Sequence, residues 1–278
     1  MITNDGNNIT IYSNVSVVVP CFRATDTICR AVSSILLQEY IPREIILVDD
    51  YSNDEGCTLR LLYDLQRQYQ NRVVIKVLEL KRNGGPGSAR NVGWSAASQP
   101  YIAFLDADDT WHPSKIRIQE QYMKENSDVA ICGHEFKFMK SAPNIESFPG
   151  GIQIKTSILN PIIFLFKSQF PTSSVMLKSS IPFRFLDGRR YAEDALLWMQ
   201  AAYGGQIVAR INLPLVFYYK SHYGEGGLSG RLWEMEKGEL CNYYLLMKSK
   251  QISIPIFVLA VVFSLIKYTR RSIVTAFK

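Results

Sequence analysis

The chain has 278 residues, of which 47% are apolar and 20% charged; this composition excludes wholesale disorder and allows one large domain with a substantial core. The net charge of +6 is confined to the C-terminal end, because six basic and no acidic residues occur from Lys248 onward. The rest of the chain is neutral, so a basic core that binds nucleic acid is not expected. The five cysteines show no C-x-x-C spacing, and residues 1–14 lack the apolar segment of a secretory signal peptide. Both features favour a reducing, cytoplasmic location.

The N-terminal half alternates strand and helix patterns, which predicts a mostly parallel sheet with helices on both faces. Val15–Pro20 is a β-branched run typical of a buried strand, and Ile28–Leu36 has the period of an amphipathic helix. Further strands are expected at 44–49, 73–80 and 101–105, with helices at 56–69 and 86–97. Because ligands bind at the carboxyl ends of parallel strands, polar residues at those ends are the first candidates for a site.

Beyond residue 125 the pattern loosens. Strands are expected at 129–132, 174–178, 206–210 and 215–220, and helices at 192–203, 231–248 and 252–269. Residues 140–156 are rich in loop formers, and the apolar segment 158–166 fits neither a helix nor a strand pattern.

Three carboxylates follow the strand expected at 101–105: Asp106, Asp108 and Asp109. Carboxylates this close repel one another unless a positive charge lies between them, and oxygen ligands suit Mg²⁺ or Mn²⁺. The alternative is an acidic turn in which Asp109 caps a helix that begins near Pro113. The position at a strand end in a βα array favours the metal interpretation.

Two more polar segments follow strands in the N-terminal half. Asp50 ends the second strand, where it could bind a nucleobase or ribose, whereas Ser52 and Asp54 are typical of a helix-initiating turn. The segment 83–93 is rich in glycine, which permits close backbone approach, and leads into a helix whose N-terminus favours an anion. It does not fit G-x-G-x-x-G, since Arg90 stands at the sixth position. Arg90 would lie near the start of that helix, within reach of a nucleotide or of the acidic cluster.

Two segments of the C-terminal half carry further candidates. Glu193 and Asp194 open an expected helix, where a carboxylate is as often a partner of the helix dipole as a functional group. His222 follows the last expected strand among glycines; a lone histidine is usually structural or exposed.

Together and in this order, these segments resemble the family 2 glycosyltransferases, particularly bacterial members that build O-antigen, lipopolysaccharide, capsule or other surface polysaccharides. The resemblance covers residues 14–230 and depends on V-S-V-V-V-P-C-F, I-L-V-D-D-Y-S, N-G-G-P-G-S-A-R-N-V-G, F-L-D-A-D-D-T-W-H-P and A-E-D. It implies an α/β GT-A fold, that is, a Rossmann-like nucleotide-diphospho-sugar transferase fold. The nucleotide-binding half would span 14–125, the acceptor half 126–230, and a helical tail 231–278.

The resemblance also implies a role for each matching residue. Pro20 and Phe22 would line the base pocket, and Asp50 would bind the uracil of a UDP-sugar. Arg90 would hold the nucleotide and the acidic cluster. Asp106 would face ribose and metal, Asp108 would bind Mn²⁺ or Mg²⁺, and His222 would touch the metal or the diphosphate. Asp194 would be the general base, with Glu193 beside it.

The reaction implied is an inverting transfer of a hexose or N-acetylhexosamine to a hydroxyl group of the acceptor. The chain departs from the family at Phe22-Arg23, where Tyr-Asn is common, and at Tyr51, where glycine is common, which puts the detail of base recognition in question.

Two other functions fit parts of the pattern. A sugar nucleotidyltransferase would normally need a glycine-rich loop after the first strand, and a catalytically dead scaffold would not need Asp106, Asp108 and Asp194.

The tail contains fifteen largely apolar residues, 252–266, followed by Lys267, Arg270 and Arg271. The run is shorter than the ~20 apolar residues of a membrane span. We expect a helix held at the cytoplasmic face of the inner membrane by apolar burial and anionic lipid; a buried helix packed on the domain is the alternative. Membrane proximity would suit an acceptor saccharide carried on a polyprenyl diphosphate, which the resemblance also suggests.

Overall fold

The structure is a computed structural model that describes residues 2–5, 8–140, 145–219 and 230–276. Its main sheet has the order β10-β12-β9-β11-β7-β3-β5-β6, and β8 pairs with β12 outside this path. The strands are β3 (Val15–Cys21), β5 (Glu44–Asp49), β6 (Val74–Glu79), β7 (Tyr101–Phe104), β8 (Thr110–Trp111), β9 (Val129–Phe138), β10 (Thr156–Ile158), β11 (Met176–Lys178) and β12 (Ile207–Tyr218).

The two halves of the sheet differ in strand direction. β7, β3, β5 and β6 are parallel, as the alternating pattern predicts. β11 then pairs antiparallel with both β7 and β9, while β9 and β12 are parallel to each other. The α/β class and the parallel N-terminal half are therefore confirmed, and the C-terminal half is mixed.

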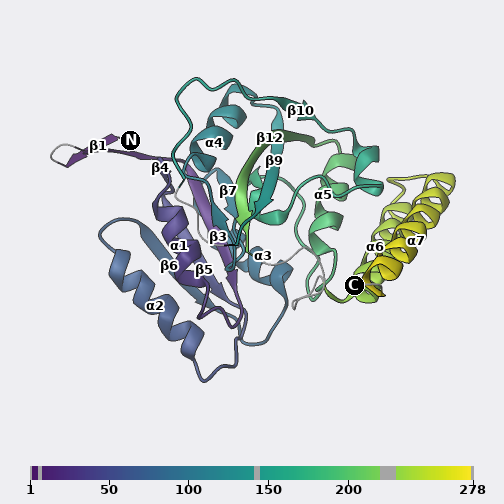
Figure 1. Ribbon diagram of the computed structural model, residues 1–278, viewed down its shortest axis with the longest axis horizontal. Helices are drawn as coiled ribbons and strands as arrows, with labels where there is room; N and C mark the ends of the chain where they lie inside the picture. Colours follow the sequence, from purple (N-terminus) through teal and green to yellow (C-terminus); the bar gives the residue numbers. More distant parts are fainter. Residues whose placement is uncertain (1, 6–7, 141–144, 220–229, 277–278) are drawn as a thin grey trace.

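Helices cover both faces of the sheet (Figure 1). α1 (Ile28–Leu36), α2 (Cys57–Tyr69) and α4 (Lys115–Glu125) share one apolar core with one face, and α3 (Pro86–Ala96) and α5 (Glu193–Tyr203) share a second core with the other. Alternation along β3 divides its side chains between them: Val17 and Val19 enter the first core and Val18 the second. Gly93 lets α3 approach closely, because a Cβ there would come within 2.4 Å of Val18 Cγ1.

The structure differs from the predicted elements in three places. A single strand, β12, replaces the two expected at 206–210 and 215–220. Pro214 has no N–H group to donate to β9, and the register of the two strands shifts on either side of it, so that the strand continues past the proline. β1 (Ile2–Asp5) pairs antiparallel with β2 (Asn8–Tyr12), and β2 pairs with the short strand β4 (Tyr40–Ile41). The segment of undecided type contains a 3-10 turn, η1 (Pro161–Leu165), and a second turn, η2 (Thr172–Ser174), precedes β11.

The C-terminal helices α6 (Leu232–Lys248) and α7 (Ile254–Ala276) lie side by side at one edge of the domain (Figure 1). α7 continues beyond the predicted end at 269, because Lys267 and Arg271 pair with glutamates of α6. α6 packs against α5, and Tyr243, Leu246 and Ala260 join the second core. Within the residues that the structure describes, neither α7 nor any other helix combines the length and apolar character needed to cross a membrane.

Candidate active site

The glycine-rich segment is anchored to the end of β5 by Asp50. Its two carboxylate oxygens accept the backbone N–H groups of Gly84 (2.7 Å) and Gly85 (2.8 Å), and Asn83 Nδ2 donates to the Asp50 carbonyl at 2.8 Å. Burial raises the pKa of Asp50, and the two N–H groups oppose the shift. Asp50 thus positions the loop that leads into α3; its predicted contact with a uracil stays a prediction.

Two exposed aromatic side chains lie on the segments that follow β3 and β5. Phe22 and Tyr51 are 48% and 46% exposed, while Pro20 is half-buried. Arg23 joins the two segments, since its backbone N–H donates to Ser52 Oγ at 3.0 Å and its Nε to the Ser52 carbonyl at 3.1 Å. Tyr51 has φ of 55°, a left-handed conformation that glycine adopts without strain.

Ser52 and Asp54 have the structural role that the sequence favoured. Ser52 donates its backbone N–H and its hydroxyl to Asp49, and Asp54 accepts the N–H of Thr58 at 3.1 Å at the start of α2. Both residues therefore stabilise the turn that leads into the helix.

Arg90 joins the acidic strand end to the start of α5. Its guanidinium donates to Asp106 Oδ1 at 2.7 Å through Nη2 and to Glu193 Oε1 at 3.1 Å through Nη1. Arg90 is 4% exposed, and despite burial the charges of Asp106, Glu193 and Asp194 raise its pKa. Arg90 thus contacts the acidic cluster through Asp106, with Glu193 as an additional partner, and its predicted contact with a nucleotide stays a prediction.

The alternative reading of Asp109 as a helix cap is wrong. α4 begins at Lys115, and its N-cap residue Ser114 makes no side-chain capping hydrogen bond. Asp109 instead accepts a hydrogen bond of 2.6 Å from Ser173 Oγ, and the same hydroxyl accepts the N–H of Asp106 at 3.1 Å. Turn η2 therefore holds the acidic segment in place at the end of β7.

Turn η2 also contacts the other candidate carboxylate. Thr172 Oγ1 donates to Asp194 Oδ2 at 2.8 Å, one residue before Ser173, which binds Asp109. Sequence reasoning missed both hydroxyl residues. The only local signal is the small polar run P-T-S-S between apolar segments, which is common in ordinary turns.

Tyr218, at the end of β12, lies within electrostatic range of four carboxylates of the site. Burial raises its pKa well above the ordinary value, and the negative charges of Asp109, Asp106, Asp194 and Asp108 raise it further. The phenol therefore stays neutral among these four side chains. Thr172 and Ser173 are adjacent in η2 and bind Asp194 and Asp109 respectively, so Asp194 lies near the acidic strand end.

Glu193 is a carboxyl group of the site with a strongly raised pKa. It is buried, and burial together with the charge of Asp194 raises its pKa to about 7, against the opposing effect of Arg90. Gly87 of α3 makes room for it, because a Cβ at that position would lie 2.9 Å from Glu193 Cγ. Ala192, just before it, has φ of 54°, and its carbonyl accepts a hydrogen bond from Asn242 Nδ2 at 2.9 Å.

The predicted metal ligands are only partly covered by the described residues. His222 lies outside them, and within them no group of three or more His, Cys, Asp or Glu side chains is arranged to hold a metal. Asp106 and Asp108 still fit a divalent cation by chemistry: both are half-buried oxygen donors in a region where carboxylates outnumber the one buried arginine.

Asp194 also lines a cavity of about 630 Å³. The cavity lies between the segment that follows η1, the first turns of α5, and the helices α6 and α7. Asp194 therefore lies between the acidic strand end and a space large enough for a second substrate.

Residues 16–179 match the model of a protein family described as glycosyl transferase family 2. The chain belongs to this family. Family members that it resembles include an uncharacterised glycosyltransferase of Rickettsia conorii, 30% identical over 68% of this chain and 30% of the relative. The poly(ribitol-phosphate) β-N-acetylglucosaminyltransferase TarP of Staphylococcus aureus is 33% identical over 67% of this chain and 56% of its own length. The succinoglycan biosynthesis protein ExoO of Rhizobium meliloti is 29% identical over 78% and 62%. The chain therefore spans about a third to three fifths of these relatives.

Solved structures of TarS from S. aureus share the family's fold with this chain. Residues 1–349 of TarS in complex with UDP-GlcNAc superpose with a TM-score of 0.67 at 18% identity, over 90% of this chain and 71% of that one. The same fragment in complex with UDP gives a TM-score of 0.64. The predicted GT-A fold is confirmed.

Proposed function

We propose that the protein is an inverting glycosyltransferase that transfers a hexose or N-acetylhexosamine from a UDP-sugar to a hydroxyl of a lipid-linked saccharide. The observation that carries this proposal is the bridge from Asp106 through Arg90 to Glu193, with Asp194 beside it and facing a cavity. The TarS complexes contain UDP and UDP-GlcNAc, and relatives are named for succinoglycan and poly(ribitol-phosphate) modification. O-antigen or related surface-polysaccharide assembly is the process we infer.

The N-terminal half would bind the donor. Phe22 and Tyr51 offer exposed ring faces on which a uracil could stack, and the Asp50-anchored loop places the N-terminus of α3 near the phosphates. Asp108 and Asp106 would hold Mn²⁺ or Mg²⁺, with His222 as a further predicted ligand. The cation would offset the negative charge that develops on the leaving UDP.

Asp194 would remove the proton from the acceptor hydroxyl while that oxygen attacks the anomeric carbon. The C–O bond to UDP breaks as the new C–O bond forms on the opposite face, so an α-linked donor gives a β-linked product. Thr172 holds the carboxylate in one orientation. Arg90 neutralises the adjacent Glu193 and Asp106. General-base assistance of this kind contributes ~10²–10⁴-fold in rate.

The deciding experiment is a panel of UDP-sugars incubated with Mn²⁺ or Mg²⁺ and an acceptor-lipid extract, with UDP release measured and the product analysed by NMR. We expect metal-dependent release of UDP with one preferred sugar, and its loss in Asp194→Asn when transfer is measured. Release of pyrophosphate would indicate a nucleotidyltransferase instead. No release with any sugar would indicate a scaffold without activity.

We also propose that α7 lies on the cytoplasmic face of the inner membrane. Its outward residues Val258, Val262 and Ile266 are 51%, 50% and 63% exposed, which is unusual for apolar side chains in contact with water. Replacing these three by serine should abolish flotation with vesicles that contain anionic lipid. The matched control is Val74→Ser, an equally exposed site on β6, which should float as before. Undiminished flotation of the triple variant would refute the membrane role of α7.

A further inference from the structure

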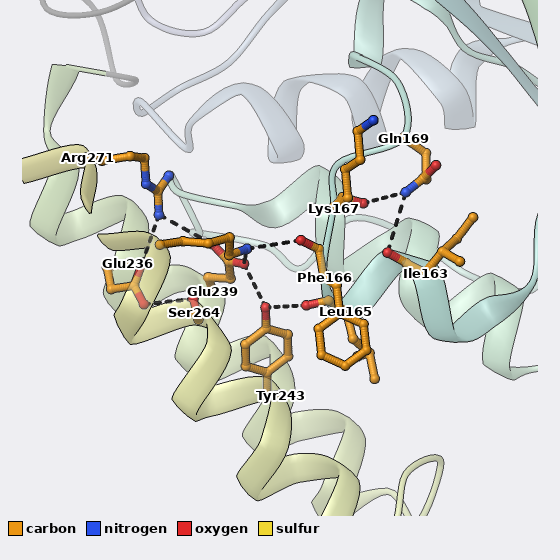
Figure 2. Close-up of polar contacts among 11 residues, drawn as sticks. Ile163, Leu165, Phe166, Lys167, Gln169, Glu236, Glu239, Tyr243, Ser264 and Arg271 are labelled. Carbon is orange, nitrogen blue, oxygen red and sulfur yellow. Dashed lines mark hydrogen bonds and ion pairs between the residues drawn. The ribbon is translucent and has the colours of Figure 1, made fainter. Parts of the chain in front are cut away.

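Ion-paired side chains are buried between α6 and α7, whereas the outer face of α7 exposes apolar side chains, among them Val258, Val262 and Ile266. Glu236 and Ser264 are both fully buried and hydrogen-bonded at 2.7 Å, and Arg271 donates to the other oxygen of Glu236 at 3.0 Å. Figure 2 shows these groups between the two helices. A helix pair in water would have the opposite arrangement. The outer face of α7 is therefore suited to an apolar medium or to an apolar ligand.

A second ion pair ties this helix pair to the segment after η1. Lys267 donates to Glu239 at 2.7 Å and to the carbonyl of Phe166 at 3.4 Å. The Tyr243 hydroxyl donates to the Leu165 carbonyl at 2.8 Å (Figure 2). α7 is consequently fixed against the catalytic domain and is one wall of the cavity that contains Asp194. A role in holding the acceptor follows from this position.

The cavity has an excess of positive charge. Four basic side chains and two acidic ones line it: Lys167, Lys267, Arg270, Arg271, Asp194 and Glu239. Lys267 and Arg271 are engaged with the glutamates of α6. Lys167 and Arg270 are exposed and have no acidic partner within the part of the chain that the structure describes. An anionic group would therefore be attracted to these two side chains.

Two buried donors in the same lining lack a hydrogen-bond partner. Trp198 Nε1 and Arg271 Nε are enclosed and unpaired among the described residues, and both residues line the cavity. A buried donor without an acceptor costs roughly 1–3 kcal/mol. An oxygen-rich ligand in the cavity would remove this cost.

The cavity also continues onto the apolar outer face of α7. Arg270 and Val274 line the cavity and belong as well to a shallow apolar surface that includes Val262, Ile266 and Ile273. A ligand could thus place a charged group beside Arg270 and lead a hydrocarbon chain out over Val274.

We propose that this cavity binds the acceptor as a polyprenyl-phosphate-linked saccharide. Its phosphate groups lie between Lys167 and Arg270, its sugar extends toward Asp194, and its hydrocarbon chain leaves along the outer face of α7. This assignment rests on the proposed function, because it names the seat of the acceptor for the same site. It makes the C-terminal helix pair part of the substrate site as well as a membrane contact.

The test measures binding of farnesyl phosphate to the full chain by isothermal titration calorimetry, with farnesol and inorganic phosphate as separate probes. We expect farnesyl phosphate to bind most tightly. Arg270→Gln and Lys167→Gln should each weaken its binding roughly tenfold, the loss of one charge-assisted contact. The matched control is Lys248→Gln, an exposed lysine at the end of α6 outside the cavity, which should leave binding unchanged.

Equal affinities for the wild-type chain and Arg270→Gln would overturn the assignment. Equally tight binding of inorganic phosphate would also overturn it, since the ligand would then be a soluble anion. Metal-dependent hydrolysis of the UDP-sugar should persist in the control variant Lys248→Gln. A wild-type chain that binds farnesyl phosphate but never releases UDP would refute the proposed function and leave the lipid site standing.

Discussion

Thr172 donates its hydroxyl hydrogen to Oδ2 of Asp194 across 2.8 Å, and this bond joins turn η2 to the first turn of α5. The adjacent Ser173 holds Asp109. One short turn therefore sets the distance between the proposed base and the acidic strand end. A small displacement of a catalytic group lowers the reaction rate strongly, so substitutions in this turn should lower kcat.

Thr172→Val removes this hydrogen bond with little change in volume. We expect kcat to fall roughly tenfold while the KM for the UDP-sugar changes little, because the donor half of the site is untouched. Asp194→Asn should lower kcat by ~10²–10⁴-fold. Steady-state kinetics with Thr156→Val, an exposed threonine on β10, as the control would check both values. A normal kcat for Thr172→Val would remove the turn from the mechanism.

Arg90→Lys should disable the site and destabilise the fold. A lysine ammonium cannot span both Asp106 and Glu193 as the forked guanidinium does, so one buried carboxylate loses its partner. We expect the free energy of unfolding to fall by roughly 3 kcal/mol and kcat/KM at least ~10²-fold. Urea denaturation and UDP release would measure these. Arg67→Lys, in an exposed pair with Asp64, should change neither.

The raised pKa of Glu193 gives the fold a distinct pH dependence. From its ordinary value of 4.5 up to about 7, the folded protein keeps a proton that the unfolded chain has released. The contribution of Glu193 to the free energy of unfolding therefore falls as the pH rises through this window.

Glu193→Gln cannot release a proton, so its unfolding free energy should decline less than that of the wild type between pH 4.5 and 7. Denaturant melts at pH 4.5, 5.5 and 7 would show the difference. Glu79→Gln, an exposed glutamate on β6, should keep the wild-type slope. Parallel pH profiles for wild type and Glu193→Gln would contradict the assignment of the raised pKa.

Asp108→Asn should weaken donor binding through the cation. The substitution keeps the shape of the side chain and removes its charge, so we expect the Mn²⁺-dependent affinity for UDP to fall at least tenfold, roughly one charge-assisted contact. Titration of UDP with and without Mn²⁺ would separate this effect from direct nucleotide contacts. Asp64→Asn, exposed on α2, is the control. An unchanged Mn²⁺ dependence would exclude Asp108 as a ligand.

Lys115→Met should stabilise the fold at neutral pH. Lys115 is fully buried beside the Trp111 ring, its Nζ has no hydrogen-bond partner among the described residues, and burial lowers its pKa well below the ordinary value. The folded protein binds fewer protons than the unfolded chain below pH 10.5, so this lysine contributes stability that rises with pH. Methionine removes the free-energy cost of burying this unpartnered amine at pH 7, which is roughly 1–3 kcal/mol. Thermal melts would detect a gain of this size. A lower Tm would show that the buried amine has a favourable partner.

Much of the N-terminal half was predictable from sequence because its signals are local. β-branched runs mark β3 and β5, and the carboxylates of Asp106 and Asp108 follow a strand whose end faces the ligand side of a parallel sheet. Gly87 and Gly93 stand where α3 must approach Glu193 and Val18 closely, and a glycine-rich pattern is readable without a structure. The end of α7 was less predictable, since cross-helix ion pairs extend it.

The sequence alone determined the fold class, the order of the strands along the chain, and the residue types that could hold a nucleotide and a cation. Only the tertiary structure decided that Arg90 meets Glu193, 103 residues away, and that Thr172, Ser173 and Tyr218 lie among the aspartates. The physical reason is that strand and helix patterns reflect the period of the backbone, whereas these contacts depend on the antiparallel insertion of β11 between β7 and β9. No local pattern encodes which distant turn will be brought to the end of a given strand.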